Sequence, residues 1–138
     1  PCCRLSNCWA RRPQPNPPRA SEDKNMGMLA AYLNATANAG GALITHIGLV
    51  NGSGVEVSGG GYARQAGTWT AASAGLVRPS ANLAFSVASG AVVAGWRGYS
   101  AVTGGTDYGG AVLTTATFSN PGTYTLLAAS TAIDHDAT

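Results

Sequence analysis

Few residues in this chain have side chains suited to chemistry, and their spacing fits no catalytic arrangement. The 138 residues include six acidic residues and two histidines. His46 lies inside an apolar run, where a hydrogen-bonded core or interface histidine is the common role. A catalytic histidine would need a carboxylate to orient it and a nucleophile beside it, and no two acids are spaced as an acid/base pair. We therefore expect no catalytic residues and no enzyme activity.

Three cysteines near the start of the sequence, Cys2, Cys3 and Cys8, could in principle bind a metal. A structural zinc site needs four ligands, with cysteines or histidines in closely spaced pairs. His46 and His135 lie far from the cysteines in the sequence, so a fourth ligand is missing. We expect no metal and no other cofactor. Reduced thiols are the favoured interpretation, and an intersubunit disulfide is the alternative.

The most distinctive stretch is Glu56-Val-Ser-Gly-Gly-Gly-Tyr-Ala-Arg-Gln65. Its triple glycine is not a phosphate-binding loop, because no Lys-Ser/Thr follows it and a strand, not a helix, comes next. We interpret the glycines as positions of positive φ that permit a tight reversal before the strand.

Arg64 follows this loop in a domain with few charges, where an arginine normally needs a carboxylate or backbone carbonyls as partners. Glu56 is the nearest acid in the sequence. We predict an Arg64–Glu56 ion pair that fixes the loop. The residues that we assign to this structural loop are Glu56, Gly59, Gly60, Gly61, Tyr62 and Arg64.

The aromatic residues allow a second kind of site. Trp69, Trp96, Tyr62, Tyr99 and Tyr108 could form an exposed platform that stacks on a host glycan. The alternative is that they are anchors in the core or in an interface, which is the more common role. The glycan-binding module stays open as an alternative function.

The overall composition favours life in an assembly. Charged residues are 10% of the chain, against a usual value of about 25%, so Ser, Thr, Asn, Gly and Ala must cover the surface. Such a surface repels other molecules weakly and suits packing. Residues 1–27 have a net charge of +3 and residues 28–138 a net charge of −1. The basic character therefore belongs to the first segment and does not mark a nucleic-acid-binding fold.

The sequence also argues against a membrane protein. No apolar run approaches the roughly 20 residues that a membrane span needs. The basic start is followed by proline-rich segments where a signal peptide would have an apolar region. Synthesis in the cytoplasm is the expectation.

Residues 1–25 differ from the rest and predict an extended basic arm. Five of the seven prolines lie here, and spaced prolines favour an extended path without internal hydrogen bonds. We predict that the arm lies along a neighbouring subunit. The candidate partner-binding residues are Arg4, Trp9, Arg11, Arg12 and Arg19.

Residues 26–138 predict one domain that begins with a short helix at 26–38. Leu29, Tyr32 and Leu33 have helical i, i+3, i+4 spacing, with Asn25 as the expected N-cap and the end at Asn38–Gly41.

The remaining sequence predicts strands. Strands are expected at 43–50, 55–58, 62–72, 83–88, 91–100, 111–118 and 123–129, with turns at 51–54, 103–105 and 120–122, the last of type II, and a polar tail at 133–138. The fold class is therefore mainly β, a single β-sandwich or jelly-roll-like domain with a short N-terminal helix.

The run Gly59–Trp69 resembles a signature of small structural proteins of tailed bacteriophages, especially those that infect actinobacteria. Other segments are similar in the same order: Leu29–Leu33, His46–Leu49, Glu56–Gln65, Asn82 to Phe85, Trp96–Ser100, Thr103–Gly105 and Gly109–Gly110. The similarity covers about residues 28–128. The loop at 51–54 is shorter than is usual in the family, and the arm before Asn25 lies outside the resemblance.

The resemblance implies a virion protein of the capsid-decoration, head-fibre or minor-tail type, with no catalytic residues to carry over. A capsid decoration or minor capsid protein on the outer head shell is the expectation. Its partners would be the major capsid protein and copies of itself, as a homotrimer, without nucleic acid or membrane. A tail or short-fibre component is the alternative.

Overall fold

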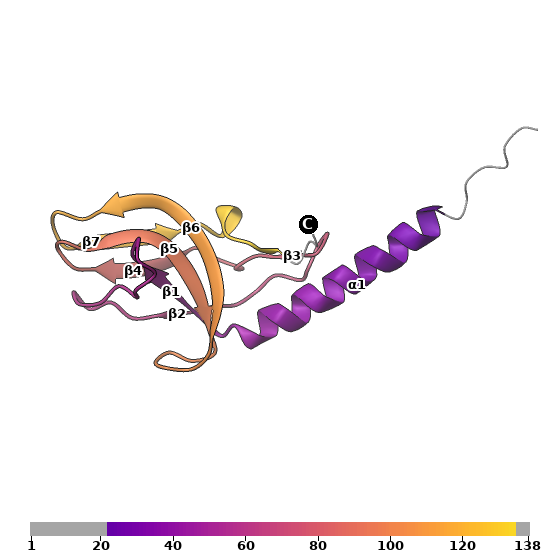
Figure 1. The fold of residues 1–138 in the computed structure, drawn as a ribbon, viewed down its shortest axis with the longest axis horizontal. Coiled ribbons are helices and arrows are strands. Elements are labelled where there is room, and N and C mark those ends of the chain that lie inside the picture. The colour runs from indigo at the N-terminus through magenta and orange to yellow at the C-terminus, as the bar shows by residue number, and fades with distance from the viewer. Residues whose placement is uncertain (1–21, 135–138) are drawn as a thin grey trace, which may run out of the picture.

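The structure is a computed structural model that describes residues 22–134, with side chains from Leu29 onward. It is built from antiparallel strands and a single α-helix within these residues (Figure 1). The elements are α1 (Glu22–Leu43), β1 (His46–Val50), β2 (Gln65–Ala66), β3 (Leu76–Val77), β4 (Leu83–Val87), β5 (Val92–Tyr99), β6 (Asp107–Thr117), β7 (Gly122–Leu126) and β8 (Ile133–Asp134). No helix among them is long and apolar enough to span a membrane.

The strands form one larger sheet and two small ones. The larger sheet has the order β2-β1-β5-β6, and the small sheets pair β4 with β7 and β3 with β8. The central pairing of β1 with β5 runs from His46 opposite Tyr99 to Val50 opposite Gly95. This is the mainly β domain with a leading helix that the sequence predicts.

The core lies between the larger sheet and the β4–β7 pair. Ile47 and Leu49 of β1 pack with Phe85 and Val87 of β4, and all four are buried. The alternation of apolar and polar residues along β4 predicts that Phe85 and Val87 face inward, and this is confirmed, because Ser86 between them is exposed. This two-layer core is the rigid platform for the site described below.

The helix is longer than predicted at both ends. Asn25 lies inside α1 and does not precede it, and the helix continues through Gly40–Gly41 to Leu43. Glycine has low helix propensity, but a side chain at Gly41 would lie 3.4 Å from Val77 and 3.5 Å from Trp69. Gly41 is buried against the domain, and this tertiary contact accompanies a helix that runs past the end predicted from local propensity.

Two of the predicted strands are mostly absent. Residues 55–58 make only a single bridge, between Val50 and Glu56, and residues 62–72 contain only the two-residue strand β2. The positive-φ glycines turn the chain between them, and a further bridge joins Trp69 to Pro79. The backbone hydrogen bonds of this stretch are isolated ones, such as Gly67 N–H to the Thr45 carbonyl at 2.9 Å, so no continuous ladder forms.

The end of the domain also differs from prediction. Ile133–Asp134 is not a polar tail but β8, which pairs with β3. Both strands are two residues long, too short for any periodicity to reveal them. Gly122 begins β7 and is not one of the positive-φ glycines, so the turn before it is not of type II. The arm residues Arg4, Trp9, Arg11, Arg12 and Arg19 lie outside the described residues.

Candidate functional site

The candidate site forms where the chain after β1 returns to the sheet. The Asn51 side chain accepts hydrogen bonds from the N–H groups of Ser53 (2.9 Å) and Val55 (3.0 Å). The Val57 N–H then donates to the Leu49 carbonyl at 2.9 Å. This predicted turn is therefore confirmed, and it places Glu56 beside the end of β1.

The triple-glycine loop reverses the chain a second time. Gly59, Gly60 and Gly61 have φ values of 84°, 64° and 78°, as the sequence predicts. Gly60 also lies so close to the backbone of Ala88 that a Cβ would be 2.7 Å from its N and Cα atoms. The loop therefore needs glycine for both conformation and space, and it brings Tyr62 and Arg64 back towards Glu56.

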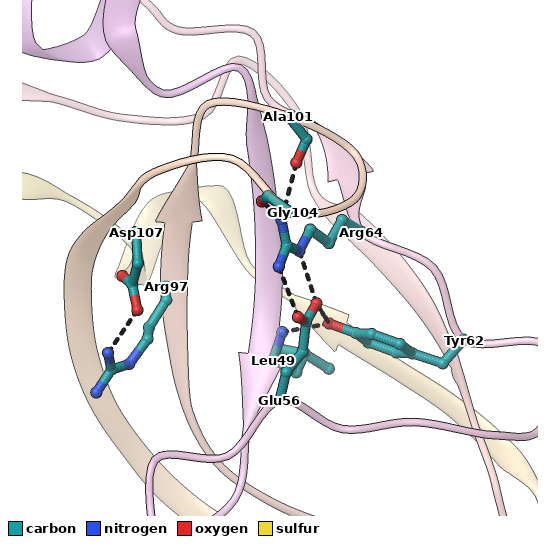
Figure 2. A network of polar contacts seen from close by, with 8 residues as sticks. All are labelled: Leu49, Glu56, Tyr62, Arg64, Arg97, Ala101, Gly104 and Asp107. Carbon is teal, nitrogen blue, oxygen red and sulfur yellow. Dashed lines mark hydrogen bonds and ion pairs between the residues drawn. The ribbon is translucent and has the colours of Figure 1, made fainter.

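Arg64 and Glu56 form the predicted ion pair with two parallel hydrogen bonds. Nε donates to Oε1 at 2.8 Å and Nη2 donates to Oε2 at 2.7 Å (Figure 2). The Arg64 side chain is 9% exposed and that of Glu56 is 29% exposed. The hydrogen bonds to Glu56 raise the pKa of Arg64 above its usual value, so the guanidinium stays charged.

The same guanidinium holds the β5–β6 loop. Its Nη1 donates to the carbonyls of Ala101 (3.0 Å) and Gly104 (2.7 Å), and its Cζ atom lies 3.4 Å from the centre of the Tyr99 ring. Arginine is suited to this role because its planar fork can bond and stack at once. We call Glu56, Tyr62 and Arg64 with these partners the arginine clamp.

Tyr62 completes the arginine clamp from the loop side. Its hydroxyl accepts a hydrogen bond from the Leu49 N–H at 2.7 Å and donates one to Glu56 Oε1 at 3.2 Å. Its ring stacks on Phe85, with centroids 6.1 Å apart. Burial, followed by the nearby Glu56 carboxylate, raises the pKa of Tyr62 well above its usual value. The hydroxyl is therefore a structural donor and acceptor.

The sequence did not predict several residues of the arginine clamp. A Cβ on Gly48 would lie 2.9 Å from Glu56 Oε1 and 2.9 Å from the Tyr99 ring, so this glycine makes room for the carboxylate. A glycine inside an apolar strand is a known sign of close approach. Ala101 and Gly104 gave no such signal, because they act through backbone carbonyls 37 and 40 residues from Arg64.

The polar groups of this site bond one another within the domain. An open hollow of about 330 Å³ lies beside the arginine clamp, lined in part by Thr103 and Gly104. The charged groups on its wall, Glu56 and Arg64, already bond each other. No cluster of three metal-ligating side chains occurs within the described residues. His46 is half-buried and shares a 2.9 Å hydrogen bond with the Thr45 hydroxyl.

The five aromatic residues do not gather into one exposed platform. Trp96 and Tyr99 are buried, and the Trp69 indole N–H donates to the Ile44 carbonyl at 2.7 Å. Only Tyr108 among the five is exposed. The arrangement matches the interpretation as structural anchors and leaves no stacking surface made of all five.

Comparisons with known proteins add no relative. No protein-family model matches the chain, and neither a curated protein nor a solved structure matches it.

Proposed function

We propose that this protein is a non-enzymatic structural component of a tailed-bacteriophage particle. The favoured role is a capsid decoration or minor capsid protein, made in the host cytoplasm, that binds the outer head shell and stabilises it. Its partners would be the major capsid protein and further copies of itself, arranged as trimers.

The arginine clamp is the observation that carries this proposal. The Glu56–Arg64 stretch that resembles the phage proteins places its charged groups in contact with one another and with the β5–β6 loop. Its most distinctive residues therefore hold a scaffold rigid and are not presented to a substrate. Rigidity of this kind suits a subunit that must bear load in a shell.

The exposed surface supports a role in assembly. Large apolar side chains face solvent on α1 (Leu29 and Tyr32) and on β6 (Val112). Charged residues that would keep such surfaces apart are scarce in this chain. The basic residues of segment 1–27 would add contacts to a neighbouring subunit.

Quantitative mass spectrometry of purified particles tests the proposal. A decoration protein should be present at the copy number of the shell subunit or at a simple fraction of it, and should label the head in electron micrographs. A few copies confined to the tail would favour the tail or short-fibre alternative. Absence from purified particles would overturn a virion role.

A binding assay with empty shells that lack the protein tests the arm. The full chain should bind these shells and raise the temperature at which they rupture. A variant without residues 1–21 keeps all of the described structure, and we expect it to bind more weakly. Equal binding by both variants would contradict the proposed role of the arm.

A further inference from the structure

Trp96 of β5 carries a polar group that the domain does not use. The residue is 4% exposed, and its indole N–H has no hydrogen-bond acceptor among the described residues. By contrast, the Trp69 N–H donates to the Ile44 carbonyl at 2.7 Å. A buried tryptophan usually finds such a partner, because a buried donor without one loses its bond to water and gains nothing in return. The Trp96 N–H is therefore available to an acceptor from outside the domain.

Trp96 borders a hollow of about 400 Å³. Sites for small molecules commonly measure about 300–1,000 Å³, so this hollow is large enough to hold a ligand. Its wall also contains Ile44 before β1, Tyr108 of β6, and Ile133 and Asp134 of β8. Trp96 belongs to the hydrophobic core and Ile133 packs against it. The hollow therefore lies at the rim of the core, on the rigid part of the domain.

Two glycines shape the β6 side of the hollow. Gly109 has a φ of 84°, and a Cβ on Gly110 would overlap the Trp96 carbonyl oxygen. The pairing of β5 with β6 shifts register at this point, between Arg97 and Tyr99. Bulges of this kind turn side chains to a new direction and are frequent beside binding sites. Here the irregular start of β6 places Tyr108, which is 43% exposed, on the wall of the hollow.

The wall of the hollow offers three kinds of group to a ligand. The Trp96 N–H is a donor that needs an acceptor, and the Tyr108 ring is an exposed flat apolar surface. Asp134 is exposed and carries a carboxylate. A carboxylate has about four lone-pair positions, so Asp134 can accept hydrogen bonds from a ligand in addition to the interaction that it makes within the protein. A ligand must therefore supply an acceptor, a donor and an apolar face.

These requirements separate the classes of ligand. An anion would be repelled by Asp134, and no Lys or Arg among the described residues lines the hollow. A quaternary ammonium suits aromatic rings and a carboxylate but has no acceptor for the Trp96 N–H. A sugar ring has hydroxyl oxygens that accept, hydroxyl groups that donate and an apolar face of C–H groups that stacks on aromatic rings.

We infer that this hollow binds a neutral sugar. The Trp96 N–H donates to a sugar oxygen, Asp134 accepts from a sugar hydroxyl, and the Tyr108 ring covers the apolar face of the sugar. Such a site adds glycan binding to the structural role proposed above. It needs only two of the five aromatic residues, so it does not require the broad platform that the structure lacks.

NMR titration of the ¹⁵N-labelled full chain tests the inference. The probes are the methyl glycosides of glucose, galactose, mannose and N-acetylglucosamine. The indole N–H resonance of Trp96 should move downfield as the group gains an acceptor. The Trp69 resonance is the internal control, because its N–H is already bonded to Ile44, and it should stay in place. For at least one glycoside we expect a Kd of about 1 mM, because a single ring makes few contacts.

Substitutions on the wall of the hollow make the test specific. Tyr108→Ala removes the exposed ring and should weaken binding about fivefold, whereas Tyr108→Phe keeps the ring and should keep most of the affinity. Asp134→Asn should also weaken binding. Val55→Ala is the matched control, since Val55 is 60% exposed and lies outside the hollow, and it should bind like the wild type. The melting temperature of each variant checks that it is folded.

Three results would overturn the inference. The first is a Trp96 resonance that does not move with any of the four glycosides at up to about 10 mM, well above the expected Kd. The second is equal affinity in the wild type and a folded Tyr108→Ala. The third is a shift with sodium acetate or tetramethylammonium chloride but with no glycoside. None of these measurements involves a shell, so failure here is distinguishable from failure of the proposed virion role.

Discussion

At the arginine clamp each charged side chain bonds another group of the same domain, whereas the outer face of α1 leaves large apolar side chains in water. Arg64 bonds one carboxylate and two carbonyls and lies on an aromatic ring. Along α1, by contrast, Tyr32 is 69% exposed. Both regions use residues that are costly to place, a buried charge in one and an exposed ring in the other.

The difference separates stability from association. The groups of the arginine clamp have exchanged water for protein partners, so removing one leaves another unsatisfied and destabilises the domain. Exposed apolar side chains of α1, such as that of Tyr32, are mostly in water already, so changing them should leave folding intact and affect the contacts that this surface makes with other molecules. Substitutions in the two regions should therefore affect different measurements.

The largest effect should come from Arg64→Ala. It leaves the Glu56 carboxylate with only the Tyr62 hydroxyl as a donor and takes the Arg64 donor from two backbone carbonyls. Removing one partner of a buried ion pair costs several kcal/mol. We expect a loss of about 3 kcal/mol in the free energy of unfolding, at the low end of the range for buried pairs because Glu56 keeps some contact with water. Urea denaturation followed by tryptophan fluorescence measures it.

Arg97→Ala is the matched control for this prediction. Arg97 donates to Asp107 at 2.6 Å, but the two side chains are 39% and 38% exposed. Figure 2 shows this pair beside the arginine clamp and separate from it. Exposed pairs contribute little, so the urea midpoint should stay near that of the wild type. Equal losses for both variants would mean that burial is not what gives the arginine clamp its strength.

A smaller effect is expected from Gly48→Ala. The new methyl group would lie 2.9 Å from Glu56 Oε1 and from the Tyr99 ring and would push the carboxylate away from Arg64. Overpacking of this kind typically costs about 1–3 kcal/mol. Gly52→Ala is the control, because a Cβ there meets nothing within 4 Å. Thermal unfolding should separate the two, and equal melting temperatures would contradict the close fit at Gly48.

The Tyr62 hydroxyl should contribute less again. Tyr62→Phe keeps the ring on Phe85 but leaves the Leu49 N–H without its acceptor, a loss of about 1–2 kcal/mol. Tyr124→Phe is the control, since Tyr124 packs edge-on against Phe118 and its hydroxyl has no hydrogen bond among the described residues. Equal urea midpoints for the two variants would show that the hydroxyl contributes nothing.

The tyrosines of the arginine clamp should make the stability of the domain depend on pH in the alkaline range. Burial raises the pKa of Tyr62 and of Tyr99. The stability from a raised pKa is complete below the unfolded value, near 10, and is lost as the pH rises through the folded value. Absorbance titration should therefore show Tyr62 and Tyr99 ionising last, and Tyr62→Phe should remove part of the alkaline loss of stability.

The sequence was informative where the signal was local. Asn51 with its turn, the glycines 59–61 and the alternation on β4 could be predicted from neighbouring residues, and so could the Arg64–Glu56 pair. Features that depend on tertiary contacts could not be predicted from the sequence. The buried position of Gly41 extended α1 past the predicted end, and the carbonyls of Ala101 and Gly104 have no side-chain signature.

The smallest predicted effect concerns Asp107 at low pH. Burial of this carboxyl would raise its pKa, but the Gly109 N–H at 2.8 Å and then the Arg97 guanidinium outweigh it and lower the pKa below its usual value. A lowered pKa adds stability above the unfolded value, near 3.9, which is lost as the pH falls through the folded value. Because Asp107 is 38% exposed, solvent and salt screen much of this contribution. Asp107→Asn should therefore match the wild type at the acid end and fall slightly below it near neutral pH. A difference in stability that widened in acid would contradict the lowered pKa of Asp107. A difference that did not shrink in high salt would mean that this exposed pair is as little screened as the arginine clamp.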